Sequence, residues 1–310
     1  MVLTRQIARF MDRNPALRVE IQPTPDDATQ RHQLYVQWLN ARVGDPDILQ
    51  LDVVWTAEFA AAGWILPLDR FAGAGGGFFP ATIEANSWAG RLYAIPWFVD
   101  VGLLYWRSDL LDRPPGTVDE LVRFAAACQS RPVSVPTVPG AAAIASGTRC
   151  LSNSSNGPQR VPRGSVGKGG APASGVPFGI VWQGARYEGL VTVFVEYLGA
   201  FGGRIMDDEG RVLVDSPEAV RALTHMRDQI HRYGVAPPEV LTWHEEETRF
   251  AFQNGNAVFM RNWPYASGLL RDSSASRVAG RFSIAPMPAT PGGRPTATLG
   301  GAQLAINAHS

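Results

Sequence analysis

The chain has 310 residues, more than one average domain, which predicts two lobes with separate cores. Its 28 basic residues balance 28 acidic ones, which excludes a broad electrostatic attraction to nucleic acid or to an anionic membrane. The expected ligand is therefore neutral or small. The chain also has nine tryptophans, and some of these large rings are expected to line a surface cleft.

The N-terminal region predicts a strand, a helix and a second strand. Residues 17–21 alternate apolar and polar side chains, as a strand does. Thr24 is placed to cap a helix with Pro25 in its first turn, and this helix is expected to end near Arg42. Residues 48–55 predict a largely buried strand. Together these elements suggest a parallel strand-helix-strand unit.

The middle of the chain continues the alternation of helices and strands. Thr117 and Glu120 form a capping-box pattern for a helix. Beyond residues 131–175, the pattern predicts a strand over 178–183 and a helix over 187–201.

The C-terminal third begins with a predicted hairpin turn at residues 207–210 and a helix that starts at Ser216. Gly234 is expected to end this helix. Residues 297–307 predict a last strand, and because no helix closes the domain before Ser310, we expect a truncated chain. One apolar stripe of the Ser216 helix is expected to face the core: Val220, Leu223, Met226 and Ile230.

Residues 131–175 differ in composition from the rest of the chain. They are rich in Pro, Gly and Ser, with five basic residues and no acidic or aromatic ones, and they contain Lys168, the only lysine. Such a segment cannot bury enough apolar area to fold. A disordered loop, an inserted or frame-shifted stretch and a functional basic arm remain open, and we expect the segment to be mobile and dispensable.

Catalytic and metal-binding motifs are mostly absent. His244 begins an acidic helix start, but the second ligand of a zinc-protease motif is replaced by Thr248. The glycines at 73–77 lack a dinucleotide-binding pattern and predict a flexible loop. Cys128 and Cys150 are too few for a disulfide framework and lack metal-site spacing, and their redox state stays open. We expect no catalytic residue, cofactor or metal, although paired carboxylates of a glycosidase would meet only in space.

Residues 254–266 are the most informative stretch. A helix stop is followed by an apolar strand and then by Arg261, Asn262, Trp263 and Tyr265. Sugars present C–H faces to aromatic rings and hydroxyls to polar side chains, so a sugar site needs both residue types at one strand end. A buried core tryptophan is the alternative.

Three segments carry a resemblance to a known family. Residues 51–69, 93–111 and 254–266 resemble the extracellular solute-binding proteins of sugar ABC transporters, family 1, and more narrowly the trehalose/maltose-binding branch. The resemblance covers nearly the whole chain except residues 131–175.

This resemblance implies an α/β, two-lobed periplasmic-binding-protein type II fold, in which each lobe is a mainly parallel sheet flanked by helices. The N-terminal lobe would comprise residues 1–108 and 288–310 and would be incomplete. The C-terminal lobe would comprise residues 113–287. The sugar would lie between the lobes, and closure would be a hinge motion.

The resemblance also implies polar ligand contacts. Asp52 and Asp100 would accept hydrogen bonds from sugar hydroxyls, because bonds to carboxylates are the stronger kind. Arg31 would offer a forked donor. Asp52 could instead cap the next element, and Arg31 could be a solvated helix residue.

The aromatic contacts implied by the resemblance are Trp263 and Tyr265, which would stack on a pyranose ring, and the backbone of Gly301 would contact a hydroxyl. This sequence departs from the branch at two positions. Phe98 replaces a ligand-binding tyrosine and loses its hydroxyl. Ala302 stands where an aromatic residue usually follows the two glycines, which removes a platform worth ~0.5 to 1.5 kcal/mol.

The implied function is that of a monomeric receptor, not an enzyme, which binds a disaccharide such as trehalose or maltose and passes it to ABC permease subunits. The family implies a periplasmic or extracytoplasmic, membrane-anchored protein, although these residues show no signal peptide or ~20-residue membrane span. A glycoside-acting enzyme and an incomplete, non-functional fragment of the binding protein are the alternatives.

Overall fold

A computed structural model describes residues 2–71, 77–129 and 176–310 of the chain. These residues form two compact units. Unit 1 comprises Met1–Trp97 and Ala302–Ser310, and unit 2 comprises Phe98–Gly301. The chain therefore passes from one unit to the other at residues 97–98 and 301–302, inside strands, whereas the resemblance suggested boundaries near 108–113 and 287–288. The expectations for residues 131–175, for Cys150 and for most of the glycine run at 73–77 lie outside the described residues.

The elements of unit 1 and of the passage into unit 2 are as follows: α1 (Val2–Arg13), α2 (Ala28–Asn40), β1 (Ile48–Asp52), α3 (Thr56–Ala61), α4 (Pro80–Ala85), β2 (Ser87–Trp88), β3 (Arg91–Leu92) and β4 (Ala94–Val101). The remaining elements are β5 (Leu103–Arg107), α5 (Val118–Cys128), β6 (Phe178–Val181), α6 (Glu188–Ala200), α7 (Pro217–His231), the 3-10 helix η1 (Pro238–Thr242), α8 (Glu245–Gln253), β7 (Ala257–Asn262), α9 (Tyr265–Leu270), β8 (Phe282–Ala285) and β9 (Leu299–Ile306).

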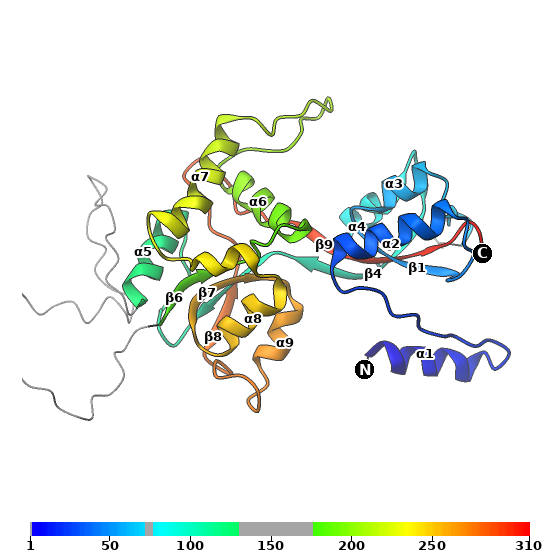
Figure 1. Cartoon of the computed structure of the whole chain (residues 1–310), viewed down its shortest axis with the longest axis horizontal. Helices are drawn as coiled ribbons and strands as arrows, with labels where there is room; N and C mark the ends of the chain where they lie inside the picture. The colour runs from blue at the N-terminus through cyan, green and yellow to red at the C-terminus, as the bar shows by residue number, and fades with distance from the viewer. Residues whose placement is uncertain (1, 72–76, 130–175) are drawn as a thin grey trace, which may run out of the picture. The chain divides into compact units, whose positions relative to one another are not determined.

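Unit 1 is built on a sheet with the strand order β1-β9-β4. β1 runs antiparallel to β9, and Asp52 at its end lies opposite Ala302. The alternating pattern of β1 places Leu49 and Leu51 in the core, where they pack with Tyr35 of α2 and Phe59 of α3. α2 and α3 thus cover the sheet strand that ends at Asp52 (Figure 1).

The predicted parallel strand-helix-strand unit is wrong in two respects. Residues 17–21 form no strand, and Leu17 and Ile21 remain 54% and 55% exposed. The neighbour of β1 is β9, from the other end of the sequence, and the pairing is antiparallel. An alternating pattern predicts a strand only where an edge is available to pair with it, and local sequence does not reveal that edge. The predicted helix does form, with Asp27 rather than Thr24 as its cap.

Unit 2 is built on a sheet with the strand order β6-β7-β5-β8. β6 and β7 are parallel, whereas β5 is antiparallel to both β7 and β8. The fold is α/β as expected, but the pairings described here are more often antiparallel than the expected mainly parallel sheets. α5 packs on β6 and α8 packs on β7 (Figure 1). All six residues of β7 are buried, so this inner strand lies in the core of the unit.

The structure confirms the predicted strand at β6, the helices α6 and α7, and the last strand β9. Ser216 caps α7, and Gly234 has the positive φ of 61° that a helix-ending glycine often adopts. Thr117 also caps α5 as predicted, because its side chain accepts a hydrogen bond from the Glu120 N–H at 3.1 Å. The Glu120 carboxylate does not complete the capping box and instead accepts hydrogen bonds from Arg113.

The predicted core stripe of α7 is half wrong. Met226 and Ile230 are buried, but Val220 is 60% exposed and Leu223 is 53% exposed. The rest of the buried face consists of two alanines and three polar residues: Ala219, Ala222, His225, Asp228 and Gln229. A 3.6-residue period fits both arrangements when apolar residues occupy more than one side of a helix, so only the position of the neighbouring helix α6 decides between them.

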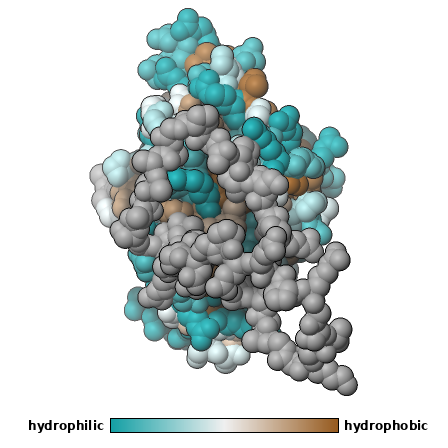
Figure 2. Space-filling model, turned by 90° about the vertical axis from the view of Figure 1, so that its left-hand side faces the viewer, coloured by the Kyte–Doolittle hydropathy of each residue, from teal (hydrophilic) through white to brown (hydrophobic). Residues whose placement is uncertain are grey.

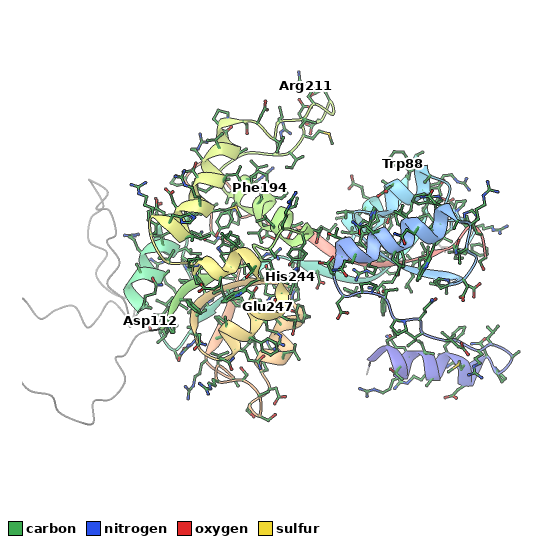
Figure 3. All side chains as sticks on the ribbon, in the orientation of Figure 1. Trp88, Asp112, Phe194, Arg211, His244 and Glu247 are labelled. Atoms are coloured by element: carbon green, nitrogen blue, oxygen red, sulfur yellow. The ribbon has the colours of Figure 1, made fainter. Side chains whose placement is uncertain are left out.

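The predicted turn at residues 207–210 is confirmed as part of a hairpin, in which the Gly210 N–H donates to the Asp207 carbonyl at 3.1 Å. Exposed apolar residues of this region, such as Met206 and Val212, stand among charged ones, such as Arg211 near the tip (Figure 3). At the top of Figure 2, hydrophobic and hydrophilic residues are correspondingly interspersed.

Candidate functional site

Trp263 follows directly after the last residue of β7 and is half-buried. Both its backbone N–H and its backbone carbonyl form hydrogen bonds. The Asn262 side-chain oxygen accepts from the Trp263 N–H at 2.8 Å, and the Tyr105 hydroxyl donates to the Trp263 carbonyl at 2.7 Å. Burial raises the pKa of Tyr105 to about 12, so this donor keeps its proton. The ring of Trp263 therefore projects from a fixed strand end.

A buried ion pair supports one face of the Trp263 ring. The Arg261 guanidinium carbon lies 3.9 Å from the ring centroid. Its Nε and Nη2 atoms donate to the two oxygens of Glu196 at 2.9 and 2.5 Å, and its Nη1 donates to Gln183 at 3.1 Å. The Arg261 and Glu196 side chains are both 0% exposed. The cation thus covers one face of the indole.

Glu245 holds the edge of the same ring. The indole Nε1–H donates to the Glu245 Oε1 atom at 3.2 Å, and the Asn262 side chain donates to the Glu245 backbone carbonyl at 3.1 Å. Glu245 is the first residue of α8, which confirms that the acidic run after His244 is a helix start. Trp263 is thus fixed at its backbone, at one face and at its N–H edge.

Asp100 and the two glycines of β9 lie beside Trp263. A methyl group placed on Gly300 would lie 3.2 Å from the indole Cζ3 atom and 3.4 Å from the Asp100 Cβ atom. Gly301 packs on the β4 backbone, where the same group would lie 2.2 Å from the carbonyl oxygen of Phe98. Phe98 itself is 44% exposed. Within unit 2 the structure therefore brings together four residues expected from the sequence.

Tyr265, the fifth expected residue of unit 2, opens α9 and is partly exposed. Its hydroxyl donates to the Glu246 carboxylate at 2.7 Å. Burial raises the pKa of Tyr265, and the Glu246 carboxylate raises it further. The hydroxyl is thus already engaged, so the ring face is the part of Tyr265 available for stacking.

Unit 1 holds the other two expected residues. Arg31 donates from Nη1 to the backbone carbonyls of Pro25 and Asp26 at 3.0 and 3.2 Å, and its guanidinium lies 5.4 Å from the Trp55 ring centroid. Its Nε atom is buried and has no hydrogen-bond partner among the described residues. Arg31 is therefore an anchored side chain rather than a solvated one.

Asp52 ends β1 and is half-buried. Burial raises the pKa of this carboxyl group, while the Val54 N–H, which donates to it at 3.3 Å, and the charge of Arg31 lower it. Asp52 therefore caps the following turn, which is the alternative role considered from the sequence. It also lies close enough to Arg31 for that positive charge to lower its pKa. A second group with a cation, a carboxylate and an aromatic ring thus exists in unit 1.

Sequence reasoning missed three side chains of these groups. The sequence pattern assigned Glu245 to an acidic helix start and Trp55 to the end of a strand. Tyr187 occupies the N-cap position of α6, and its buried hydroxyl lies beside the Glu245 carboxylate. The local sequence around Tyr187 showed only an aromatic residue at the start of a predicted helix. Tyr187 and Glu245 are 58 positions apart in the sequence, so the pattern could not show their proximity.

The described residues contain no group of three His, Cys, Asp or Glu side chains arranged to hold a metal ion. Among the same residues, no helix is both long enough and apolar enough to cross a bilayer.

Comparison with solved structures supports the fold. The chain is similar to maltose-bound MalE3 of T. maritima, with 42% identity and a TM-score of 0.81, covering 100% of this chain and 69% of that one. It also matches a ribitol complex of an ABC transporter solute-binding protein from Agrobacterium radiobacter K84, with 22% identity and a TM-score of 0.75, covering 100% of this chain and 68% of that one. The second likeness bears on the fold alone.

A curated relative extends the comparison. A probable ABC transporter-binding protein of Deinococcus radiodurans is 36% identical over 298 residues, which is 94% of this chain and 61% of that protein. The chain thus spans less than two thirds of the length of this relative. The family model for bacterial extracellular solute-binding proteins matches residues 5–310, and its description places the family outside the cytoplasm. The chain belongs to the bacterial extracellular solute-binding protein family.

Proposed function

We propose that this chain is the substrate-binding receptor of a carbohydrate ABC importer. Its ligand is a neutral sugar, specifically a disaccharide such as maltose or trehalose, which it binds without converting it. It acts as a monomer and delivers the sugar to the permease subunits from outside the cytoplasm. The family, the name of the Deinococcus relative and the maltose complex of the T. maritima relative support this proposal.

The observation that carries the proposal is the fixed Trp263 ring beside Asp100. One indole face is covered by Arg261 and the Trp263 side chain is only half-buried, so a sugar ring would stack its C–H face on the other indole face, while the nearby carboxylate is suited to accept hydroxyl hydrogen bonds. A charged ligand would instead need uncompensated charges, and the buried cation here is neutralised by Glu196.

We expect Trp263→Ala to weaken sugar binding by at least ~1 kcal/mol, because the substitution removes the stacking surface and the cation–π contact of Arg261. Isothermal titration with maltose and with trehalose measures the loss. Trp88→Ala is the matched control, because Trp88 is an exposed tryptophan of unit 1, and this variant is expected to bind like the parent.

Equal affinity of the Trp263 variant and the parent would remove Trp263 from the site. The same samples, incubated with maltose, trehalose and longer glucans, separate the receptor from a glycoside-acting enzyme. Turnover of any of these sugars would contradict the proposed function.

A further inference from the structure

We propose that Glu245 is a specificity-determining residue of this site, which accepts a hydrogen bond from a sugar hydroxyl at the edge of the Trp263 ring. The inference rests on the proposed sugar binding and adds to it a ligand contact that comes from α8. It concerns unit 2 alone.

The first argument is the orientation of the Glu245 carboxylate. Its Oε1 atom accepts the indole Nε1–H at 3.2 Å, which places the carboxylate at the ring edge. The Tyr187 hydroxyl also interacts with this carboxylate. A carboxylate has about four lone-pair sites, more than these two donors use. A half-buried carboxylate beside an aromatic platform thus remains able to take hydroxyl donors.

The second argument is the geometry of stacking. Because Arg261 covers one face of the indole, a sugar ring can stack only on the other face. A pyranose carries its equatorial hydroxyls around the periphery of the ring, so a sugar stacked on Trp263 places them near the edges of the indole. Glu245 lies at one of these edges, and Asp100 lies near the ring beside Gly300.

The third argument is the buried hydroxyl of Tyr187. This buried group makes no well-aligned hydrogen bond to a described residue, although it lies beside the Glu245 carboxylate, and a poorly paired buried polar group is costly. Burial raises the pKa of Tyr187, the charge of Glu245 and the interaction of the hydroxyl with its carboxylate raise it further, and Arg261 lowers it, so the hydroxyl lies close to both charged groups. A sugar hydroxyl that bridges Glu245 and Tyr187 would satisfy both side chains.

A purely structural role for Glu245 as a helix cap is the competing explanation. Helix capping, however, is performed by Glu247, whose carboxylate accepts the His244 N–H at 3.0 Å in a capping box. Figure 3 labels His244 and Glu247 at this start of α8. Glu245 and Glu247 share the same helix turn and the same favourable interaction with the helix dipole, which makes Glu247 a matched control.

The test compares Glu245→Gln and Glu247→Gln with the parent by titration with maltose and with trehalose, together with thermal melting. Glutamine keeps the shape and still offers an acceptor to the indole N–H, but it loses the charge. We expect Glu245→Gln to bind the better sugar about tenfold more weakly with an unchanged melting temperature, because a charge-assisted hydrogen bond becomes a neutral one. Glu247→Gln is expected to bind like the parent.

Tyr187→Phe provides a second measurement. It is expected to weaken binding as well, and its effect should not add to that of Glu245→Gln if both side chains contact the same hydroxyl. A folded Glu245→Gln variant with the affinity of the parent overturns the inference and leaves the proposed function standing. A parent protein that binds neither sugar overturns the proposed function, and the inference with it.

Discussion

Replacing Glu196 by alanine is expected to destabilise the protein by ~3 to 5 kcal/mol, because the substitution leaves the Arg261 charge buried without its partner. Both oxygens of Glu196 accept hydrogen bonds from Arg261, and Oε1 also accepts the Thr298 N–H at 3.2 Å. The pair is 0% exposed on both sides, so water cannot replace the lost contacts. Urea unfolding followed by circular dichroism measures the change.

Two further variants serve as controls for the Glu196→Ala measurement. Glu218→Ala breaks an ion pair with Arg221 at the surface of α7, where solvent screens the charges, and its effect is expected to be much smaller. The double variant Glu196→Leu with Arg261→Met removes both charges and is expected to be more stable than Glu196→Ala alone. Similar losses for Glu196→Ala and Glu218→Ala would show that the buried pair does not support unit 2.

Gly301→Ala is expected to cost at least ~2 kcal/mol of stability and to weaken sugar binding with it. The φ angle of Gly301 is +112°, a region that side chains rarely allow. The added methyl group would also lie 2.2 Å from the Phe98 carbonyl oxygen and 3.0 Å from the Asp100 N–H nitrogen. These are backbone atoms, so the strands themselves would have to move, and Asp100 would move with them.

The control for this variant is Gly268→Ala. Gly268 lies in α9 with nothing within 4 Å of the added methyl group, so alanine there is expected to be neutral or slightly stabilising. Thermal melting and maltose titration measure both variants. If Gly301→Ala kept the melting temperature and the affinity of the parent, the close approach of β9 to β4 would not be needed for the site.

Elements with strong local signals were predictable from sequence. Ser216 caps α7 and Thr117 caps α5 as predicted, because a side-chain oxygen that accepts a backbone N–H depends only on residues a few positions away. The aromatic and polar residues at the end of β7 and directly after it were also predictable as neighbours, because they are adjacent in the chain. The family resemblance added Asp52 and Asp100, which periodicity alone would not have selected.

Contacts between distant parts of the chain were not predictable. Residues 17–21 have the pattern of a strand but form none, and two residues of the predicted α7 stripe are exposed. In each case the pattern shows what a segment is able to form, while the neighbour that would bury it lies elsewhere in the sequence.

By itself, the sequence determined most helices and strands, the strand end that carries Trp263 and the family, because caps, periodicity and motifs act over short distances. Only the tertiary structure decided that β1 pairs with β9, that Arg261 is buried with Glu196 beneath the indole, and that Glu245 holds its edge. These contacts join residues between 18 and about 250 positions apart, and the free energy that selects them comes from the packing and burial of the whole unit rather than from any local segment.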